Sequence, residues 1–158
     1  METKKQYSED GKKNIVYQCP MWCEEKKTYN TREYQTAVRF FYDRFLTRKQ
    51  PRSADMDSVD KNIGVNVYEY MWGPSEFTAT GILKNYDRTK DLHLIKVPVL
   101  FIAGEYDEAR AGTVKYYSSL IKGSQFVLIP NAGHLTMQDN PEMDVKVIRE
   151  FINKLESR

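Results

Sequence analysis

Residues 97–107 read Val-Pro-Val-Leu-Phe-Ile-Ala-Gly-Glu-Tyr-Asp, and residues 126–134 read Phe-Val-Leu-Ile-Pro-Asn-Ala-Gly-His. Each stretch begins with a continuous apolar run, Val97 to Ala103 and Phe126 to Ile129, which predicts a strand buried on both faces. Between the two runs, apolar residues recur at helical spacing and stop at Gly123, a predicted helix end: Val114, Tyr117, Leu120 and Ile121. A strand, a helix and a strand joined by short loops predict a parallel βαβ unit with a right-handed crossover.

A further amphipathic helix is predicted after the second strand. It begins near Pro141, because proline is well tolerated in the first turn of a helix. Its apolar face consists of Met143, Val147, Ile148, Phe151 and Leu155. The predicted fold class is therefore α/β.

Two titratable side chains follow the two predicted strands. Asp107 comes shortly after the first strand and His134 shortly after the second. The carboxyl ends of parallel strands form one ligand-facing edge, so we expect both side chains on that edge. A carboxylate that fixes a histidine tautomer and supports its charged form needs this placement. The alternative is structural: Asp107 caps the following helix and the backbone satisfies His134. The joint placement favours an acid–base pair.

The region before residue 91 is predicted to be helical where it is patterned. Thr31 is a candidate cap, Glu33 supports the first turn, and apolar residues follow at helical spacing: Tyr34, Ala37, Val38, Phe41 and Phe45. Pro51 and the polar run from Ser53 to Asp60 are predicted to end this helix. A second piece, Val65 to Trp72, stops at Gly73, and its aromatic residues are expected in the core of a small helical layer: Tyr68, Tyr70, Trp72 and Phe77.

Composition excludes several classes of protein. The chain has 158 residues, of which 41% are apolar, and this fits one globular domain. Its net charge of +2 gives no electrostatic reason to expect nucleic-acid binding. No apolar run approaches membrane-spanning length, and the first residues are charged, so we expect no membrane association. Cys19 and Cys23 lack a nearby histidine, which favours reduced thiols in a cytoplasmic protein over a disulfide or a zinc site. His93 is expected to pack or to be exposed, and no metal or other cofactor is expected.

Longer motifs carry a resemblance to a known family. Leu94 to Asp107, followed by Gly133-His-Leu-Thr-Met137, resembles the C-terminal part of the α/β-hydrolase fold. Tyr70-Met-Trp-Gly-Pro-Ser-Glu-Phe77, with Gly81-Ile-Leu-Lys-Asn-Tyr-Asp87, narrows the resemblance to the proline iminopeptidases (prolyl aminopeptidases). Residues 33–38 and 40–42 are similar to a helix of that family's cap, whereas the first thirty residues show no defensible similarity.

The resemblance implies a serine peptidase that removes an N-terminal proline from short peptides. Asp107 would be the acid of the catalytic triad and His134 the general base. Glu76 would pair with the free amine of the substrate between Trp72 and Phe77, because a cationic amine calls for a desolvated acid beside aromatic rings. The alternative for Glu76 is an ordinary helix or loop hydrogen bond. Glu33 is a second candidate, although an acid in a first helical turn already has a structural reason.

The chain departs from the family pattern at the nucleophile. A nucleophile elbow reads Gly-x-Ser-x-Gly and precedes the acid and the histidine. No two glycines in the chain lie four apart, and a His-Gly-Gly-type oxyanion segment is absent too. Ser75, in Gly-Pro-Ser-Glu-Phe, lacks the second glycine and the preceding strand, so we do not expect it to be the nucleophile.

The sequence thus predicts a partial α/β-hydrolase fold, with two parallel strands, flanking helices and a helical cap remnant. Residues 1–30 are unassigned, 31–89 form the cap portion and 90–158 the hydrolase portion. We expect the Asp-and-His half of a serine aminopeptidase, inactive unless a complementary N-terminal hydrolase chain supplies the serine. The alternatives are a non-catalytic interaction or regulatory module and a truncated gene product. An unpaired edge on the strand from Val97 to Ala103 predicts strand addition, a homodimer or poor solubility.

Overall fold

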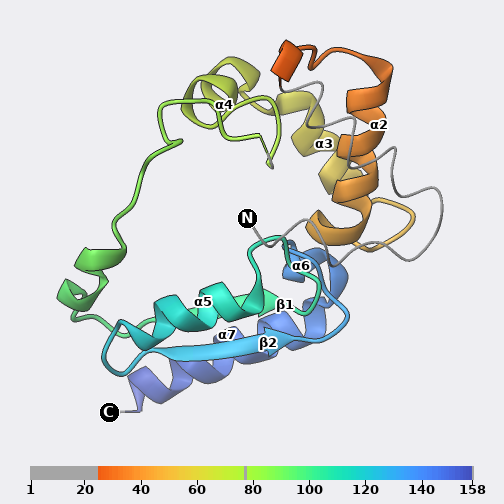
Figure 1. Ribbon diagram of the computed structural model, residues 1–158. Helices are drawn as coiled ribbons and strands as arrows, with labels where there is room; N and C mark the ends of the chain where they lie inside the picture. Colours follow the sequence, from red (N-terminus) through yellow and green to blue (C-terminus); the bar gives the residue numbers. More distant parts are fainter. Residues whose placement is uncertain (1–24, 77, 158) are drawn as a thin grey trace. The chain divides into compact units, whose positions relative to one another are not determined.

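Residues 25–76 and 78–157 are described by the computed structural model (Figure 1). Backbone contacts divide the chain into two compact units. The helical unit contains residues 1–41 and 63–85, and the sheet unit contains residues 42–62 and 86–158. Residues 42–62 thus group with the sheet, whereas the sequence assigned them to the cap portion.

A two-stranded parallel sheet forms the centre of the sheet unit. Strand β1 (Leu100–Gly104) pairs with β2 (Gln125–Ile129), and helix α5 (Ala111–Ser119) connects them. Leu100 lies opposite Gln125 and Gly104 opposite Ile129, so both strands end at the same edge. The predicted parallel βαβ unit is confirmed. Strand β1 begins at Leu100, three residues later than the predicted start at Val97.

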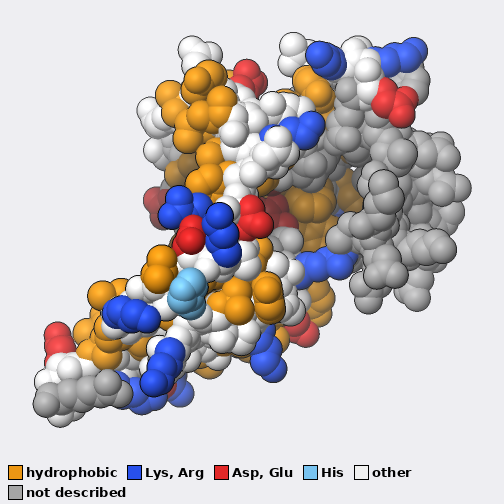
Figure 2. Space-filling model, turned by 60° about the vertical axis from the view of Figure 1, so that its left-hand side comes forward, with side chains coloured by type: hydrophobic (Ala, Val, Ile, Leu, Met, Phe, Trp, Pro, Cys, Tyr) orange, Lys and Arg blue, Asp and Glu red, His pale blue; other side chains and the backbone are white. Residues whose placement is uncertain are grey.

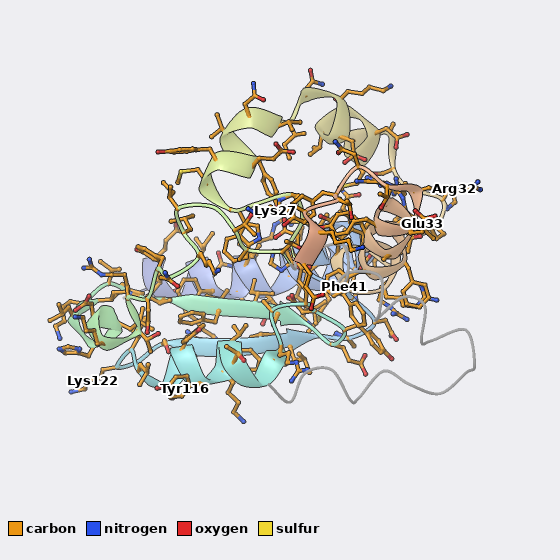
Figure 3. All side chains as sticks on the ribbon, turned by 45° about the horizontal axis from the view of Figure 1, so that its top comes forward. Lys27, Arg32, Glu33, Phe41, Tyr116 and Lys122 are labelled. Carbon is orange, nitrogen blue, oxygen red and sulfur yellow. The ribbon has the colours of Figure 1, made fainter. Side chains whose placement is uncertain are left out.

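Helices α5 and α7 (Pro141–Glu156) lie on opposite sides of the two strands (Figures 1 and 3). Helix α7 begins at the predicted Pro141, and the side chain of Asn140 caps it by accepting a hydrogen bond from the Met143 amide at 3.3 Å. The core between α7 and the sheet is centred on Ile129, Ala132 and Val147. Packed against this core are Leu100, Ile102, Val127 and Met143.

The two strands are less covered than their apolar sequences predict. Strand β2 exposes Gln125 and Leu128, the latter at 42%, and only Ile129 is buried. Each strand of this two-stranded sheet pairs with one other strand, and a single helix covers each face of the sheet. This is not enough to bury both faces fully. Hydrophobic side chains are visible at the surface beside lysine and arginine (Figure 2). Large exposed ones in the sheet unit are Val59, Tyr86, Leu94, Val97, Tyr106, Tyr116, Leu128, Met137, Val145, Ile148 and Ile152.

The helical unit contains α2 (Arg32–Phe41) and α4 (Val65–Met71). As predicted, Thr31 caps α2, its hydroxyl accepting a hydrogen bond from the Tyr34 amide at 3.3 Å. Tyr34 and Ala37 form the buried side of this helix. Helix α4 buries no residue fully, and Tyr70 is 66% exposed, so its prediction as a core residue is wrong. A seven-residue helix has too short a face to bury all of its aromatic rings.

Residues 42–62 depart most from the sequence prediction. Helix α2 continues into a π-helical turn, η1 (Tyr42–Leu46), and α3 (Ala54–Asn62) forms over the polar run predicted to be a break. The Ser53 hydroxyl accepts a hydrogen bond from the Met56 amide at 3.3 Å and so caps α3. A 3-10 helix, η2 (Thr89–Leu94), contains the exposed His93, and α6 (Thr136–Asp139) is a single turn before α7. No helix within the described residues is long and apolar enough to cross a membrane.

Candidate active site

The loops that follow the two strands lie against each other at the carboxyl edge of the sheet. The Glu105 amide donates to the Ile129 carbonyl and the Tyr106 amide to the Ala132 carbonyl, both at 2.9 Å. A Cβ atom on Gly104 would come within 2.1 Å of the Gly133 carbonyl oxygen. Only glycine therefore permits this approach, which fixes the separation between the loop that carries Asp107 and the loop that carries His134.

The side chains of Asp107 and His134 form a hydrogen bond across these loops. Asp107 Oδ1 lies 2.9 Å from His134 Nδ1. The Asp107 side chain is 3% exposed, whereas the His134 side chain is 46% exposed. The expected contact between the two residues is therefore present.

Asp107 is oriented by the backbone of its own loop. Its carboxylate accepts hydrogen bonds from the Gly104 amide at 3.2 Å and from the Ala109 amide at 2.7 Å. An ionised Asp107 makes Nδ1 of His134 the hydrogen-bond donor, so the neutral ring carries its basic lone pair on Nε2. This arrangement is able to accept a proton at Nε2 and to stabilise the imidazolium that results.

The backbone of the His134 loop is held by residues from the start of the sheet unit. The His134 amide donates to the Phe45 carbonyl and the Leu135 amide to the Leu46 carbonyl, both at 2.8 Å. Sequence analysis did not identify this support, because main-chain hydrogen bonds between distant segments leave no pattern in side-chain types.

Asp139, at the end of α6, is a second residue that sequence analysis missed. Its carboxylate accepts hydrogen bonds from the amides of Gly133, Arg48 and Lys49 and from the Thr47 hydroxyl. Partial burial raises the pKa of Asp139, but the hydrogen bonds, first those from Gly133 and Arg48, outweigh burial and hold this pKa below its ordinary value of 3.8.

Glu76 lies in the helical unit and is held by two aromatic side chains. The Tyr68 hydroxyl donates to Glu76 Oε1 at 2.7 Å, and the Trp72 indole N–H donates to the Glu76 carbonyl at 3.1 Å. Glu76 and Trp72 are half-buried. Phe77 lies outside the described residues, so its predicted place beside Glu76 stays a prediction. Glu33 is exposed in the first turn of α2 (Figure 3).

Ser75 has the environment of a structural serine. It is 1% exposed, and its hydroxyl lies 2.7 Å from the Tyr34 hydroxyl, which also donates to Thr78 Oγ1 at 2.9 Å. The helical unit contains no histidine, since both histidines of the chain belong to the sheet unit. Its burial and its hydrogen bond to Tyr34 give Ser75 a structural reason to be present, and its exclusion as the nucleophile stays a prediction.

Metal ligation has no support in the part of the chain that the structure describes. It contains no group of three or more His, Cys, Asp or Glu side chains that could hold a metal ion. Cys19 and Cys23 lie outside the described residues.

Comparison with known proteins was made on sequence and on structure. No family model matches the chain. The proline iminopeptidase of Heyndrickxia coagulans is 34% identical over 157 residues, a match that covers 94% of this chain and 54% of that protein. The crystal structure of proline iminopeptidase from Mycobacterium smegmatis superposes with a TM-score of 0.79 at 27% identity, over 92% of this chain and 50% of that one. The chain resembles the C-terminal part of proline iminopeptidase.

The crystal structure of VinJ gives a TM-score of 0.83 at 30% identity, over 89% of this chain and 48% of that one. The fold is accordingly a partial α/β-hydrolase fold. The chain spans about half the length of the proline iminopeptidases described above.

Proposed function

We propose that this chain supplies the acid and the base of a serine aminopeptidase that releases N-terminal proline from peptides. The observation that carries the proposal is the hydrogen bond between Asp107 and His134, at the carboxyl ends of two neighbouring parallel strands. The similarity to proline iminopeptidases supports the choice of substrate class. A cytoplasmic location is part of the proposal.

The proposed chemistry requires a serine from outside these 158 residues, because the chain has no Gly-x-Ser-x-Gly motif. Nε2 of His134 takes the proton of that serine as its oxygen attacks the carbonyl carbon of the proline residue. Asp107 stabilises the imidazolium, which then protonates the departing amine of the shortened peptide. In the second half, His134 deprotonates a water that attacks the acyl-enzyme, and proline leaves as the serine recovers its proton.

Glu76 is the proposed partner of the protonated ring nitrogen of the N-terminal proline. Tyr68 fixes one of its carboxylate oxygens, and the half-buried setting keeps the charge partly shielded from water. A partly desolvated carboxylate binds an ammonium-type group more strongly than an exposed one. Glu33, which is exposed, is the weaker candidate for this role.

The proposed partner is a complementary N-terminal hydrolase segment that pairs with β1. The Val99 carbonyl and the Glu105 amide both bond to β2, and alternate residues of a strand direct their main-chain groups to alternate edges. Leu100 and Ile102 therefore present theirs to the other edge, where no strand pairs with β1 within the described residues. An apolar strand with an open edge is a template for pairing. A second copy of this chain is the alternative partner.

The test is hydrolysis of a proline arylamide by the purified chain, alone and after co-expression with the N-terminal half of the Heyndrickxia coagulans enzyme. We expect no turnover by the chain alone, because removing the nucleophile of such a triad costs on the order of a million-fold. Co-expression should restore turnover, and His134→Ala should abolish it again.

Two outcomes contradict the proposal. Turnover by the chain alone that survives Ser75→Ala and is lost with His134→Ala would show a nucleophile within these residues. A stable complex with the N-terminal half that gives no turnover would instead indicate an interaction module that kept the fold without the chemistry.

A further inference from the structure

Asp139 connects two segments that are far apart in the sequence. Oδ1 accepts hydrogen bonds from the Thr47 hydroxyl at 2.8 Å and from the Arg48 and Lys49 amides at 2.9 Å. Oδ2 accepts from the Gly133 amide at 2.7 Å and shares the Arg48 amide at 2.9 Å. Four donors from three consecutive residues and one loop residue thus converge on a single carboxylate.

These bonds complete a row of contacts between the His134 loop and residues 45–49, which we call the brace. Phe45 and Leu46 of the brace accept the amides of His134 and Leu135. Gly133 lies so close to the brace that a Cβ atom there would come within 2.8 Å of the Phe45 carbonyl oxygen. The two hydrogen bonds from the His134 and Leu135 amides do not involve the amide of Gly133 or residues 47–49 of the brace. The Asp139 carboxylate accepts hydrogen bonds from Gly133 and from residues 47–49, and hydrogen bonds to a charged acceptor are stronger than those between neutral groups.

The brace is also the direct continuation of α2 through η1. The brace and the His134 loop both belong to the sheet unit, so these contacts lie within one unit. The His134 side chain is 46% exposed, so the position of its ring depends on the backbone of its loop as well as on the hydrogen bond to Asp107.

We propose that Asp139 is a positioning residue, which fixes the His134 loop to the brace and thereby holds the His134 ring against Asp107. This role rests on the proposed function of His134 as a general base. Asp139 itself touches neither the substrate nor the reacting atoms. Loss of its carboxylate should loosen the loop, lengthen the contact between His134 and Asp107 and leave the sheet in place.

The experiment is ¹⁵N NMR of the complete chain, with two readouts. The first is hydrogen exchange of the Gly133 and His134 amides, compared with amides of β2. The second is the Nδ1–H resonance of His134, which reports its hydrogen bond to Asp107. In Asp139→Asn we expect the loop amides to exchange about tenfold faster or more, with β2 amides changed much less, and the Nδ1–H resonance to broaden or disappear.

Thr47→Val, which removes one donor and leaves the carboxylate, should give a smaller change in the same direction. If Asp139→Asn does not fold, the Thr47→Val variant alone tests the positioning role of Asp139. Asp144→Asn is the matched control: Asp144 is a buried carboxylate that accepts from Thr136 Oγ1 at 2.6 Å in the same corner and does not bond to the brace. This control should leave the Nδ1–H resonance unchanged.

An unchanged Nδ1–H resonance and unchanged loop exchange in both Asp139→Asn and Thr47→Val would overturn the positioning role. So would equal acceleration at β2, which indicates a purely structural carboxylate. Neither readout requires turnover. Failure of the complementation assay would therefore leave these results readable, and failure here would leave the proposed chemistry untouched.

Discussion

Replacing Tyr34 by phenylalanine removes a single oxygen atom from a fully buried ring of the helical unit. Tyr34 is fully buried, and its hydroxyl bonds to both Ser75 and Thr78 on the turn that carries Glu76. Ser75 and Thr78 are themselves 1% and 3% exposed, so water cannot replace the missing partner. The variant therefore tests how firmly α2 holds this turn.

The expected cost follows from the burial of the partners. Tyr34 donates to Thr78 and so accepts from Ser75, whose hydroxyl hydrogen loses its acceptor in Tyr34→Phe. A buried donor left unsatisfied costs about 1–3 kcal/mol. We expect the free energy of unfolding to fall by about 2 kcal/mol, which at a typical slope for urea corresponds to a midpoint lower by about 1 M.

The assay is equilibrium urea unfolding of the complete chain, followed by tryptophan fluorescence. Tyr70→Phe is the matched control, because the same atom is removed from a ring that is 66% exposed. It should change the unfolding free energy by no more than about 0.5 kcal/mol.

A double variant separates the hydrogen bond from simple packing. The double variant Tyr34→Phe with Ser75→Ala also removes the Ser75 hydroxyl that has lost its acceptor. Its loss of unfolding free energy should therefore be about 1 kcal/mol smaller than the sum of the losses in the two single variants. Strict additivity, or a cost for Tyr34→Phe no larger than that of the exposed control, would refute the reasoning.

Three further predictions concern charge, substrate binding and association. The pKa of Asp139 in the folded chain lies below its unfolded value of 3.8, so its contribution to stability is present above pH 3.8 and is lost as the pH falls through the folded pKa. Urea midpoints measured from pH 7 to pH 2 should therefore fall more steeply for the native chain than for Asp139→Asn. In the complemented enzyme, Glu76→Gln should raise KM for a proline arylamide by about tenfold, whereas Glu33→Gln should change it by less than about twofold; equal effects would place the amine elsewhere. Sedimentation velocity should show concentration-dependent association of the isolated chain through the open edge of β1, and a monomer at every concentration would show that this edge is already covered.

The contact between Asp107 and His134 can be predicted from sequence because local patterns determine it. Asp107 and His134 each follow a short apolar run, and parallel strands bring the ends of such runs to one edge. Pro141 and Thr31 likewise mark helix starts through their own chemistry. These predictions need no knowledge of which distant segments meet.

Features that depend on distant contacts are the ones the sequence does not predict. Asp139 precedes Asn140 and Pro141, so in sequence it resembles any acid before a helix. Three of its four hydrogen-bond donors, from Thr47, Arg48 and Lys49, lie 90 to 92 residues away. Helix α3 forms over a polar run that alone favours a loop, and its capping residue Ser53 also donates to Gln138 Oε1 at 2.8 Å, 85 residues away. Tyr70 belongs to an apolar-looking segment whose helix is too short to bury it.

The close approach at Gly104 has a consequence for how this chain can vary among natural isolates. Any other residue would need the His134 loop to retreat, since the added carbon would meet main-chain oxygen atoms of Ala132 and Gly133 that no rotamer change can move. A gene that drifts without selection on the acid–base pair loses this glycine as readily as any other, because one nucleotide change converts a glycine codon to alanine. Sequencing this locus across many strains therefore gives a genetic test that needs no substrate. Glycine kept at position 104 while exposed positions such as Tyr116 vary freely would indicate that the spacing of the two loops is still under selection.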